Sequence, residues 1–310
     1  MEMNAAREKF SRYCAMAVLL CLAAFSPPPA ACGMAFNQTG ATYTFSHLDL
    51  WNACFGISSP KAGSAYYKAL KELSGKAIDG WKAHERYAGG GTLAAIQRKF
   101  PWFEPSPFQH RFLYHWGFSR SVSESRYHRE IVRKTVPQDR RREERQLLAF
   151  LQRTWEDRRR SVLRSFQRAL GGVFPSPNDV EAFAALAYDL HILGDYGATG
   201  DGRDQIAALI PPEPLAEELI KQGIRPLFGD RGSALEASLR RASDGVGEMA
   251  SAEARRRAAR DMANALLDAL PSLMHENFGA EFAAQGLNID VSKKFVIAGE
   301  GFTPWQLLPR

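Results

Sequence analysis

A long helix is predicted over residues 138–170, where apolar residues recur at helical spacing from Leu147 onwards, and this stretch constrains the fold more than any other feature of the chain. They lie mostly three or four residues apart, which is the period of one face of an α-helix. Gly171 and Gly172 follow the stretch and predict its end. The apolar positions are Leu147, Leu148, Leu151, Trp155, Val162, Leu163, Phe166 and Leu170.

The next predicted helix has a clear start signal. Ser176 suits the N-cap, Pro177 suits the first helical position, and Asp179 lies three residues after the cap. Its buried stripe is expected to contain Phe183, Leu186, Ala187, Leu190 and Leu193.

Further helical patterns occur in the remaining chain, and one short segment has the pattern of a strand. We therefore expect an all-α protein, a multi-helix bundle with little or no β-structure. The expected helices are 61–87, 213–222, 234–243 and 251–279, and the strand is 294–298.

The first 35 residues have the pattern of an export signal. Basic residues come first, an apolar run over 14–25 follows, and prolines and small residues end the segment. The run is too short to cross a bilayer comfortably, although an N-terminal membrane anchor is the alternative. We expect residues 1–31 to be a signal peptide, with cleavage as late as residue 35 also compatible. Residues 36–310 then form a single helical domain that is exported, either periplasmic or secreted.

The cysteines limit the metal chemistry. Cys32 follows two alanines and resembles a lipoprotein acceptor, so its lipidation would attach the chain to a membrane, although Pro29 departs from such signals. If Cys32 and Cys54 both survive, one disulfide is possible in an oxidising compartment; otherwise Cys54 is a lone, buried thiol. No Cys-x-x-Cys pair occurs in the sequence. Histidine and carboxylate side chains must therefore hold any metal.

Charge is concentrated on the long helix over 138–170. Arginines occupy 140–142 and 158–160, and acidic residues are interleaved with them. Mixed signs at helical spacing indicate a solvated, salt-bridged face, with binding to nucleic acid or an anionic surface as the alternative. The formal net charge of +6 suits an anionic substrate or surface. We infer no protein partner.

His191 and Asp195 are the strongest candidates for a metal site. They lie four residues apart on the helix that begins near Ser176, so their Cβ atoms are expected about 5–6 Å apart. An imidazole nitrogen and a carboxylate oxygen can then bind one cation, and this pair suits Zn²⁺ better than Ca²⁺ or Mg²⁺. The alternative is a His–Asp hydrogen bond inside a helical core.

A second group contains His110 and His115, with aromatic residues between them. In a helix their separation of five residues points them roughly 140° apart, so each would serve a different ion in a multi-metal cluster. Packing of both imidazoles between aromatic rings is equally compatible. His47 and His275 stand alone, and an isolated histidine is more often a hydrogen-bonded core or surface residue.

The segment Leu190-His191-Ile192-Leu193-Gly194-Asp195 resembles the His-x-x-x-Asp helix of the zinc-dependent phospholipase C and S1/P1 nuclease family. The segment 45–48, Phe-Ser-His-Leu, is similar to the early "SHL" histidine of the phospholipase branch. The resemblance implies an all-α fold around two or three zinc ions and hydrolysis of phosphodiesters. It implies that His191, Asp195 and His47 are ligands. It also implies His110 or His115 as the mid-chain ligand and His275 as the late histidine.

The sequence departs from this family after Asp195. The family's next ligand histidine is missing, and Asp201 is the nearest substitute. Gly279 stands where the late His-x-x-x-Glu pattern has its acid, and the N-terminal tryptophan of the family has no match.

The sequence therefore predicts an exported zinc-dependent hydrolase of phosphoesters, a phosphodiesterase acting on phospholipid or nucleic acid. Arg111 is the candidate for contact with the anionic substrate. The alternative is a non-catalytic exported helical protein or lipoprotein with a degenerate or structural metal site.

Overall fold

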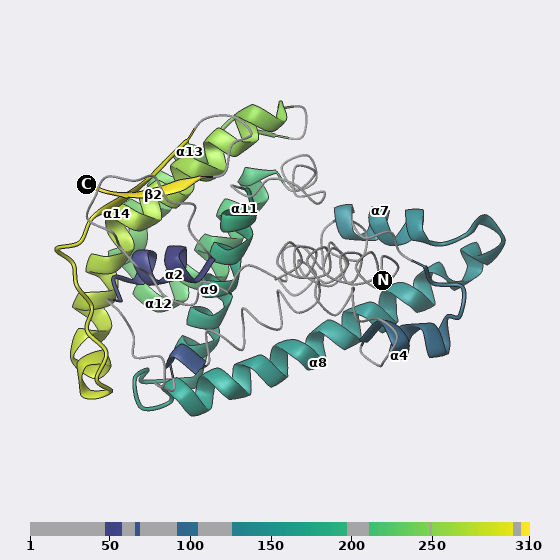
Figure 1. Ribbon diagram of the computed structural model, residues 1–310, viewed down its shortest axis with the longest axis horizontal. Helices are drawn as coiled ribbons and strands as arrows, with labels where there is room; N and C mark the ends of the chain where they lie inside the picture. The colour runs from purple at the N-terminus through teal and green to yellow at the C-terminus, as the bar shows by residue number, and fades with distance from the viewer. Residues whose placement is uncertain are drawn as a thin grey trace, which may run out of the picture. The chain divides into compact units, whose positions relative to one another are not determined.

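Helices make up 76% of the residues that the structure describes, which confirms the predicted all-α class (Figure 1). The structure is a computed structural model that describes residues 47–57, 66–68, 92–104, 126–196, 211–247, 250–299 and 305–310. All of them belong to one compact unit, Thr42–Arg310. The predicted signal peptide and Cys32 lie outside the described residues.

The described elements follow one another along the chain as helices, with one β-hairpin near the C-terminal end. The helices are α2 (His47–Phe55), α4 (Thr92–Lys99), α7 (Arg126–Thr135), η3 (Gln138–Glu143), α8 (Glu144–Leu170), α9 (Pro177–Tyr196), α11 (Pro212–Glu218), η5 (Leu219–Ile224), α12 (Arg225–Phe228), η6 (Gly229–Gly232), α13 (Ser233–Ser243) and α14 (Ala252–Ala284). The strands are β1 (Phe295–Ala298) and β2 (Gln306–Pro309).

The predicted boundaries agree with the structure at most helix ends. The long helix predicted over 138–170 consists of the 3₁₀-helix η3 followed by α8. The helix predicted over 213–222 is α11 continued by the π-helix η5, a local change of winding that apolar periodicity does not reveal. Of the helix predicted over 61–87, only residues 66–68 are described, and they are helical.

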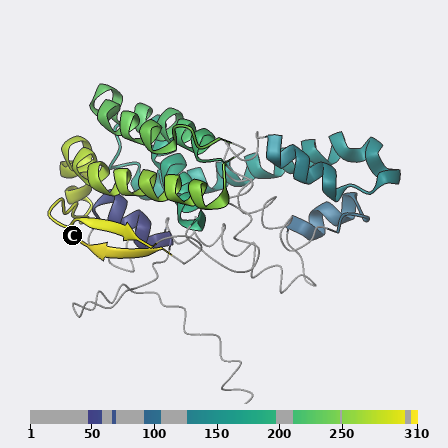
Figure 2. The same cartoon turned by 90° about the horizontal axis from the view of Figure 1, so that it is seen from above.

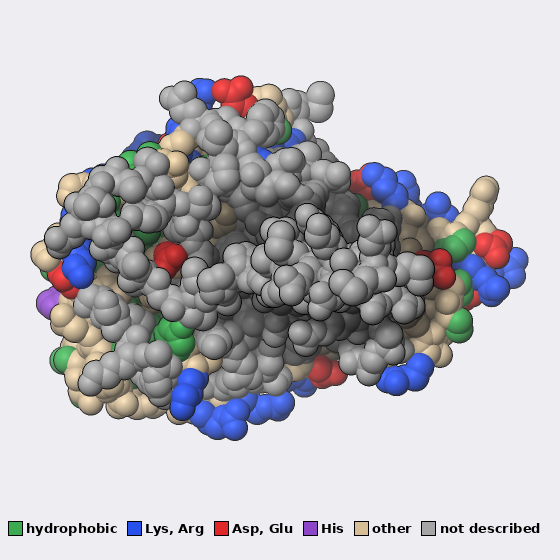
Figure 3. Space-filling model, in the orientation of Figure 1, with side chains coloured by type: hydrophobic (Ala, Val, Ile, Leu, Met, Phe, Trp, Pro, Cys, Tyr) green, Lys and Arg blue, Asp and Glu red, His purple; other side chains and the backbone are tan. Residues whose placement is uncertain are grey.

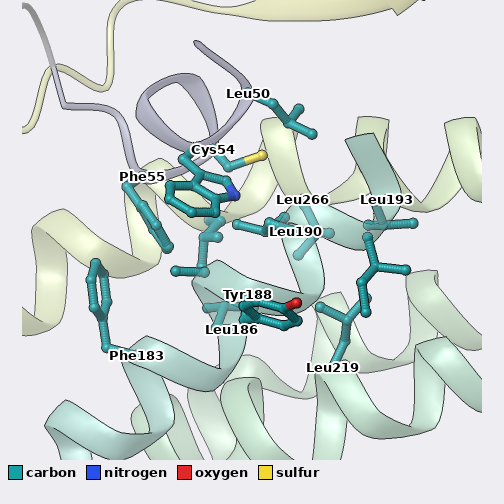
Figure 4. Close-up of a cluster of buried hydrophobic side chains, with 14 of the residues drawn as sticks. Leu50, Cys54, Phe55, Phe183, Leu186, Tyr188, Leu190, Leu193, Leu219 and Leu266 are labelled. Atoms are coloured by element: carbon teal, nitrogen blue, oxygen red, sulfur yellow. The ribbon is translucent and has the colours of Figure 1, made fainter. Parts of the chain in front are cut away.

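Helices α2, α9 and α14 pack against one another and bring together the main hydrophobic core (Figure 4). Leu50 and Phe55 from α2 lie over Leu190 from α9, and Leu266 from α14 closes the same cluster. Each of these four side chains is fully buried. Burial of one such side chain contributes about 1.5–3 kcal/mol, so this contact supplies much of the force that holds α9 in place.

The end of α2 meets α14 at a glycine. Gly56 adopts a φ of 67°, a left-handed conformation that glycine accepts without strain. A side-chain Cβ added at Gly56 would lie 2.9 Å from the Cβ of Pro271, which stands inside α14. Absence of a side chain at Gly56 therefore lets the two helices approach closely, and it fixes where α2 stops.

The β-hairpin lies against α14 (Figure 2). Its strands are antiparallel, with Val296 opposite Leu308. The side chain of Asn264 in α14 accepts a hydrogen bond from the Ile297 amide at 2.7 Å and donates one to the Ile297 carbonyl at 3.3 Å. Asn264 thus satisfies the outer edge of β1. The strand predicted over 294–298 is confirmed, whereas β2 was not anticipated.

Within the described residues, no helix is both long and apolar enough to cross a membrane.

Candidate functional site

Helix α9 carries the predicted metal pair, and its register is set at its first turn. The Ser176 hydroxyl accepts a hydrogen bond from the Asp179 amide at 3.2 Å. The Asp179 carboxylate accepts one from the Ser176 amide at 3.0 Å. These two bonds form a reciprocal cap that satisfies two backbone donors at the start of the helix. The predicted start of α9 is therefore confirmed, with its physical cause.

His191 is fully buried on α9 and lies between two aromatic side chains. The Trp51 ring of α2 meets it edge-on, with ring centroids 5.9 Å apart and an interplanar angle of 61°. Tyr188, one turn earlier on α9, lies at the same centroid distance with an angle of 37°. These contacts restrict the imidazole to a narrow range of orientations. Its position is thus determined by α2 as much as by α9.

Helix α2 also brings His47 into the neighbourhood of α9. His47 is the first residue of α2 and lies one helical turn before Trp51, which contacts His191 directly. Asp195 lies one turn after His191 on α9. The side chains of His47 and Asp195 are outside the described part of the structure. At the level of the backbone, the helices that carry three of the predicted ligands are therefore packed together.

Of the other predicted ligands, the structure describes His275 alone. His275 lies on the exposed side of α14. His110, His115, Arg111 and Asp201 lie outside the described residues. Among the side chains that are described, no group of three or more His, Cys, Asp or Glu could hold a metal ion. His191 is the one member of the predicted ligand set that is both described and buried.

Polar side chains that sequence reasoning missed surround this part of the core. Asn52 of α2 and Asp189 of α9 are both buried, with 6% and 4% of their surface exposed. Arg256 of α14 is also buried and donates a hydrogen bond from Nη1 to the Tyr196 carbonyl at 2.6 Å. A cation is favourable at a helix C-terminus because the last carbonyl groups lack partners there. Arg256 thus satisfies the end of α9, just after Asp195.

A sequence signal for the buried arginines does exist. Arg256 lies three residues before Ala259 and seven before Ala263, which are both buried on α14. An arginine at the helical period of an apolar stripe is expected to be buried and partnered. That pattern could have identified Arg256 before the structure was known.

Two buried polar atoms of α2, one of them on the Trp51 ring that contacts His191, indicate what this part of the core can accommodate. Neither the Trp51 indole Nε1 nor the Asn52 Oδ1 has a hydrogen-bond partner, within the described portion of the chain. A buried polar atom without a partner costs about 1–3 kcal/mol. The indole N–H is a donor only, so the surroundings of Trp51 favour an acceptor such as an anion oxygen.

Zinc is the metal that the residue types at positions 47, 191 and 195 would suit, and of their side chains only that of His191 is described. An imidazole from His191, with a second imidazole and a carboxylate at positions 47 and 195, is a ligand set that zinc accepts. Cys54 does not add a thiolate, because burial raises the pKa of its thiol far above the ordinary value. Cys54 is free and buried, so it packs as a small apolar residue.

Comparison of the chain with protein-family models, with characterised proteins and with solved structures finds no match. The similarity to the phospholipase C and S1/P1 nuclease family thus stays a prediction that depends on the segments 45–48 and 190–195.

Proposed function

We propose that this chain is an exported zinc-dependent hydrolase of phosphoester bonds. The observation that carries the proposal is the contact between Trp51 of α2 and the buried His191 of α9. This contact joins the helix that starts at His47 to the helix that holds His191 and Asp195. Two segments far apart in the sequence, chosen for their resemblance to one metal-dependent family, therefore belong to one packed unit.

In this proposal His191 and Asp195 hold the metal, with His47 from α2 as a further ligand. His110 or His115 and Asp201 complete the proposed set for two or three zinc ions, whereas His275 is left out because it lies on the exposed side of α14. The chemistry that zinc supplies when bound is polarisation of a phosphoryl oxygen and a water of lowered pKa. Arg111 is proposed to contact the phosphate of a phospholipid or nucleic acid.

The described residues have separate tasks in this proposal. Trp51 and Tyr188 hold the His191 ring in one orientation, which a metal ligand requires. Arg256 holds the carbonyl end of α9 and so keeps the Asp195 turn in place. The fully buried apolar side chains around His191 exclude water from one side of the ligand set. These roles are all ones of positioning.

A non-catalytic helical protein is the second candidate, and one observation favours it. His191 is fully buried and contacts two aromatic rings, as a histidine that merely fills the core would. In that case the fold is stable without metal, and a chelator leaves the unfolding temperature unchanged. The zinc proposal expects the unfolding temperature to fall on chelation, because metal binding to the native state adds to its stability.

The test is the metal content of the purified full chain, measured by elemental analysis after zinc reconstitution and dialysis. We expect two or three zinc ions per chain and turnover of bis(p-nitrophenyl) phosphate, a simple phosphodiester. Asp195→Asn keeps the shape of the side chain and removes its charge, so it is expected to lose metal and activity. His191→Ala is expected to do the same, with circular dichroism to verify that the helices remain.

His128→Ala is the matched control, because His128 lies in α7 and outside the proposed ligand set. It is expected to retain both metal and activity. Absence of bound zinc in the folded wild-type chain would overturn the proposal and leave the structural role of His191. Full zinc content in Asp195→Asn would overturn the assignment of Asp195.

A further inference from the structure

Every basic side chain of helix α8 is an arginine. Its 27 residues include seven arginines, three acidic residues and no lysine. The planar guanidinium group binds phosphate through two parallel hydrogen bonds, whereas lysine acts as a point charge. A helix that uses only arginine therefore has the side chain best suited to phosphate groups.

The exposed arginines of α8 form one stripe. At 100° per residue, the five described and exposed ones fall within a sector of about 140° along roughly 35 Å of helix. Figure 3 shows Lys and Arg side chains along the lower edge of the view, where α8 runs in Figure 1. The members of this arginine stripe are Arg145, Arg153, Arg160, Arg164 and Arg168.

The predicted salt-bridged face is present at the start of the long helix, where Arg140 pairs with Glu143 and Arg141 with Glu144, but it covers the arginine stripe only in part. Arg160 pairs with Asp157 at 2.7 Å, and Glu156 lies in the same sector but is only partly exposed. Arg145 and Arg164 have no carboxylate partner within the described residues, and Arg153 donates to the Ala149 carbonyl at 3.3 Å. Within the described residues, Arg145, Arg153 and Arg164 therefore have no carboxylate partner, so this part of the stripe keeps a positive potential.

We infer that the arginine stripe of α8 is a docking surface for anionic phospholipid headgroups at a membrane surface. A flat bilayer presents phosphates along the whole length of a straight stripe. No described aromatic side chain of α8 is exposed, so the binding is electrostatic and lies at the headgroup level.

Nucleic acid fits the same surface less well. The phosphates of a DNA duplex wind round its axis once in about 34 Å, so a straight stripe meets each strand only along part of its length. Single strands are bound mainly by exposed aromatic side chains on which bases stack, and the described residues of α8 offer none. The inference does not depend on the metal site, because the stripe contains none of its ligands.

The experiment is flotation of the full chain with vesicles of phosphatidylcholine alone or with about one third phosphatidylglycerol. The wild-type chain is expected to bind the anionic vesicles more strongly and to be released by high salt. A variant with Arg145→Gln, Arg153→Gln and Arg164→Gln is expected to bind them on the order of a hundredfold more weakly, at about fivefold per arginine.

The matched control removes three exposed arginines from other helices, through Arg231→Gln, Arg241→Gln and Arg257→Gln. Both triple variants lose three positive charges and keep the predicted signal peptide unchanged, so they differ only in where the arginines are removed. Loss of binding in the α8 variant alone supports the inference. Equal losses in both variants, or equal binding of the wild type to both vesicles, would overturn it. Zinc-loaded and chelated protein are expected to bind alike, which separates this result from the fate of the zinc proposal.

Binding of the same variants to a 20-base-pair DNA duplex, measured in parallel, tests nucleic acid as the other occupant of the arginine stripe. Loss of duplex binding in the α8 variant, with vesicle binding unchanged, would reject the lipid surface and assign the stripe to nucleic acid.

Discussion

Helices α8 and α9 follow each other in the chain, yet they differ in how much of their surface is buried by other elements. The described arginines on α8 are exposed, and only one of its long faces is apolar. Residues 186–194 of α9 are buried on every side, including His191 and Asp189. A helix with one polar face meets solvent, whereas a helix buried all round owes its environment to its neighbours. The composition of α8 therefore indicates the chemistry of its exposed face. The environment of the buried α9 side chains depends instead on the helices that pack around them.

The largest expected effect lies in the α9 core. Phe183 is fully buried and contacts Phe55 and Phe174, with ring centroids 4.5 and 5.2 Å apart. We expect Phe183→Ala to lower the free energy of unfolding by about 3–5 kcal/mol in urea denaturation, because it leaves a cavity. Gln152→Ala on the exposed side of α8 is the control, expected within about 0.5 kcal/mol of wild type. Similar losses in both variants would break the contrast between the helices.

The second effect tests how closely α9 is packed. A Cβ at Gly223 in η5 would lie 2.9 Å from the Cβ of Leu186 on α9. We expect Gly223→Ala to cost about 1–3 kcal/mol, because two helices must separate to admit one methyl group. Gly247→Ala places its methyl group in open space and is expected to cost nothing. Thermal unfolding of both variants checks this, and a neutral Gly223→Ala would contradict the close packing of η5 on α9.

A smaller effect is expected at the start of α9. Ser176→Ala removes the hydroxyl that accepts from the Asp179 amide, and we expect a loss of about 1 kcal/mol in urea unfolding. Ser238→Ala is the control, because Ser238 lies inside α13 and alanine is the better helix former. If the two serine variants are equally stable, the cap does not determine where α9 begins.

The smallest effect concerns an exposed ion pair of the kind that α8 carries. Arg240 donates to the Glu217 carboxylate at 2.9 Å, and this bond lowers the pKa of Glu217. A carboxyl with a lower pKa in the folded state stabilises the fold above its unfolded pKa, about 4.3 for glutamate. That contribution is lost as the pH falls through the folded pKa.

Glu217→Gln is therefore expected to lower the urea midpoint slightly at pH 7 and by less at pH 3. The effect is small because both side chains are about half exposed to water. A large decrease at pH 7, or a decrease that is undiminished at pH 3, would show that an exposed pair matters as much as the core.

Local sequence signals predicted the ends of helices well, whereas they did not predict which distant residues pack together. Ser176, Pro177 and Asp179 predicted the start of α9, because a cap involves residues only three positions apart. The burial of His191 against Trp51 was not predictable, because those residues meet only when α2 packs on α9. The sequence analysis did not identify Arg256, because its burial depends on contact with the end of α9.

The sequence by itself determined the helical class, the end of α8, the start of α9, the strand β1 and the abundance of arginine on α8. These features depend on periodicity, caps and charge within a few residues of chain. Only the tertiary structure decided which helix covers His191, that Arg256 satisfies Tyr196, and that Asn264 satisfies Ile297 in β1. The physical reason is that burial and hydrogen-bond partners belong to pairs of residues far apart in the sequence, and packing alone brings such pairs together.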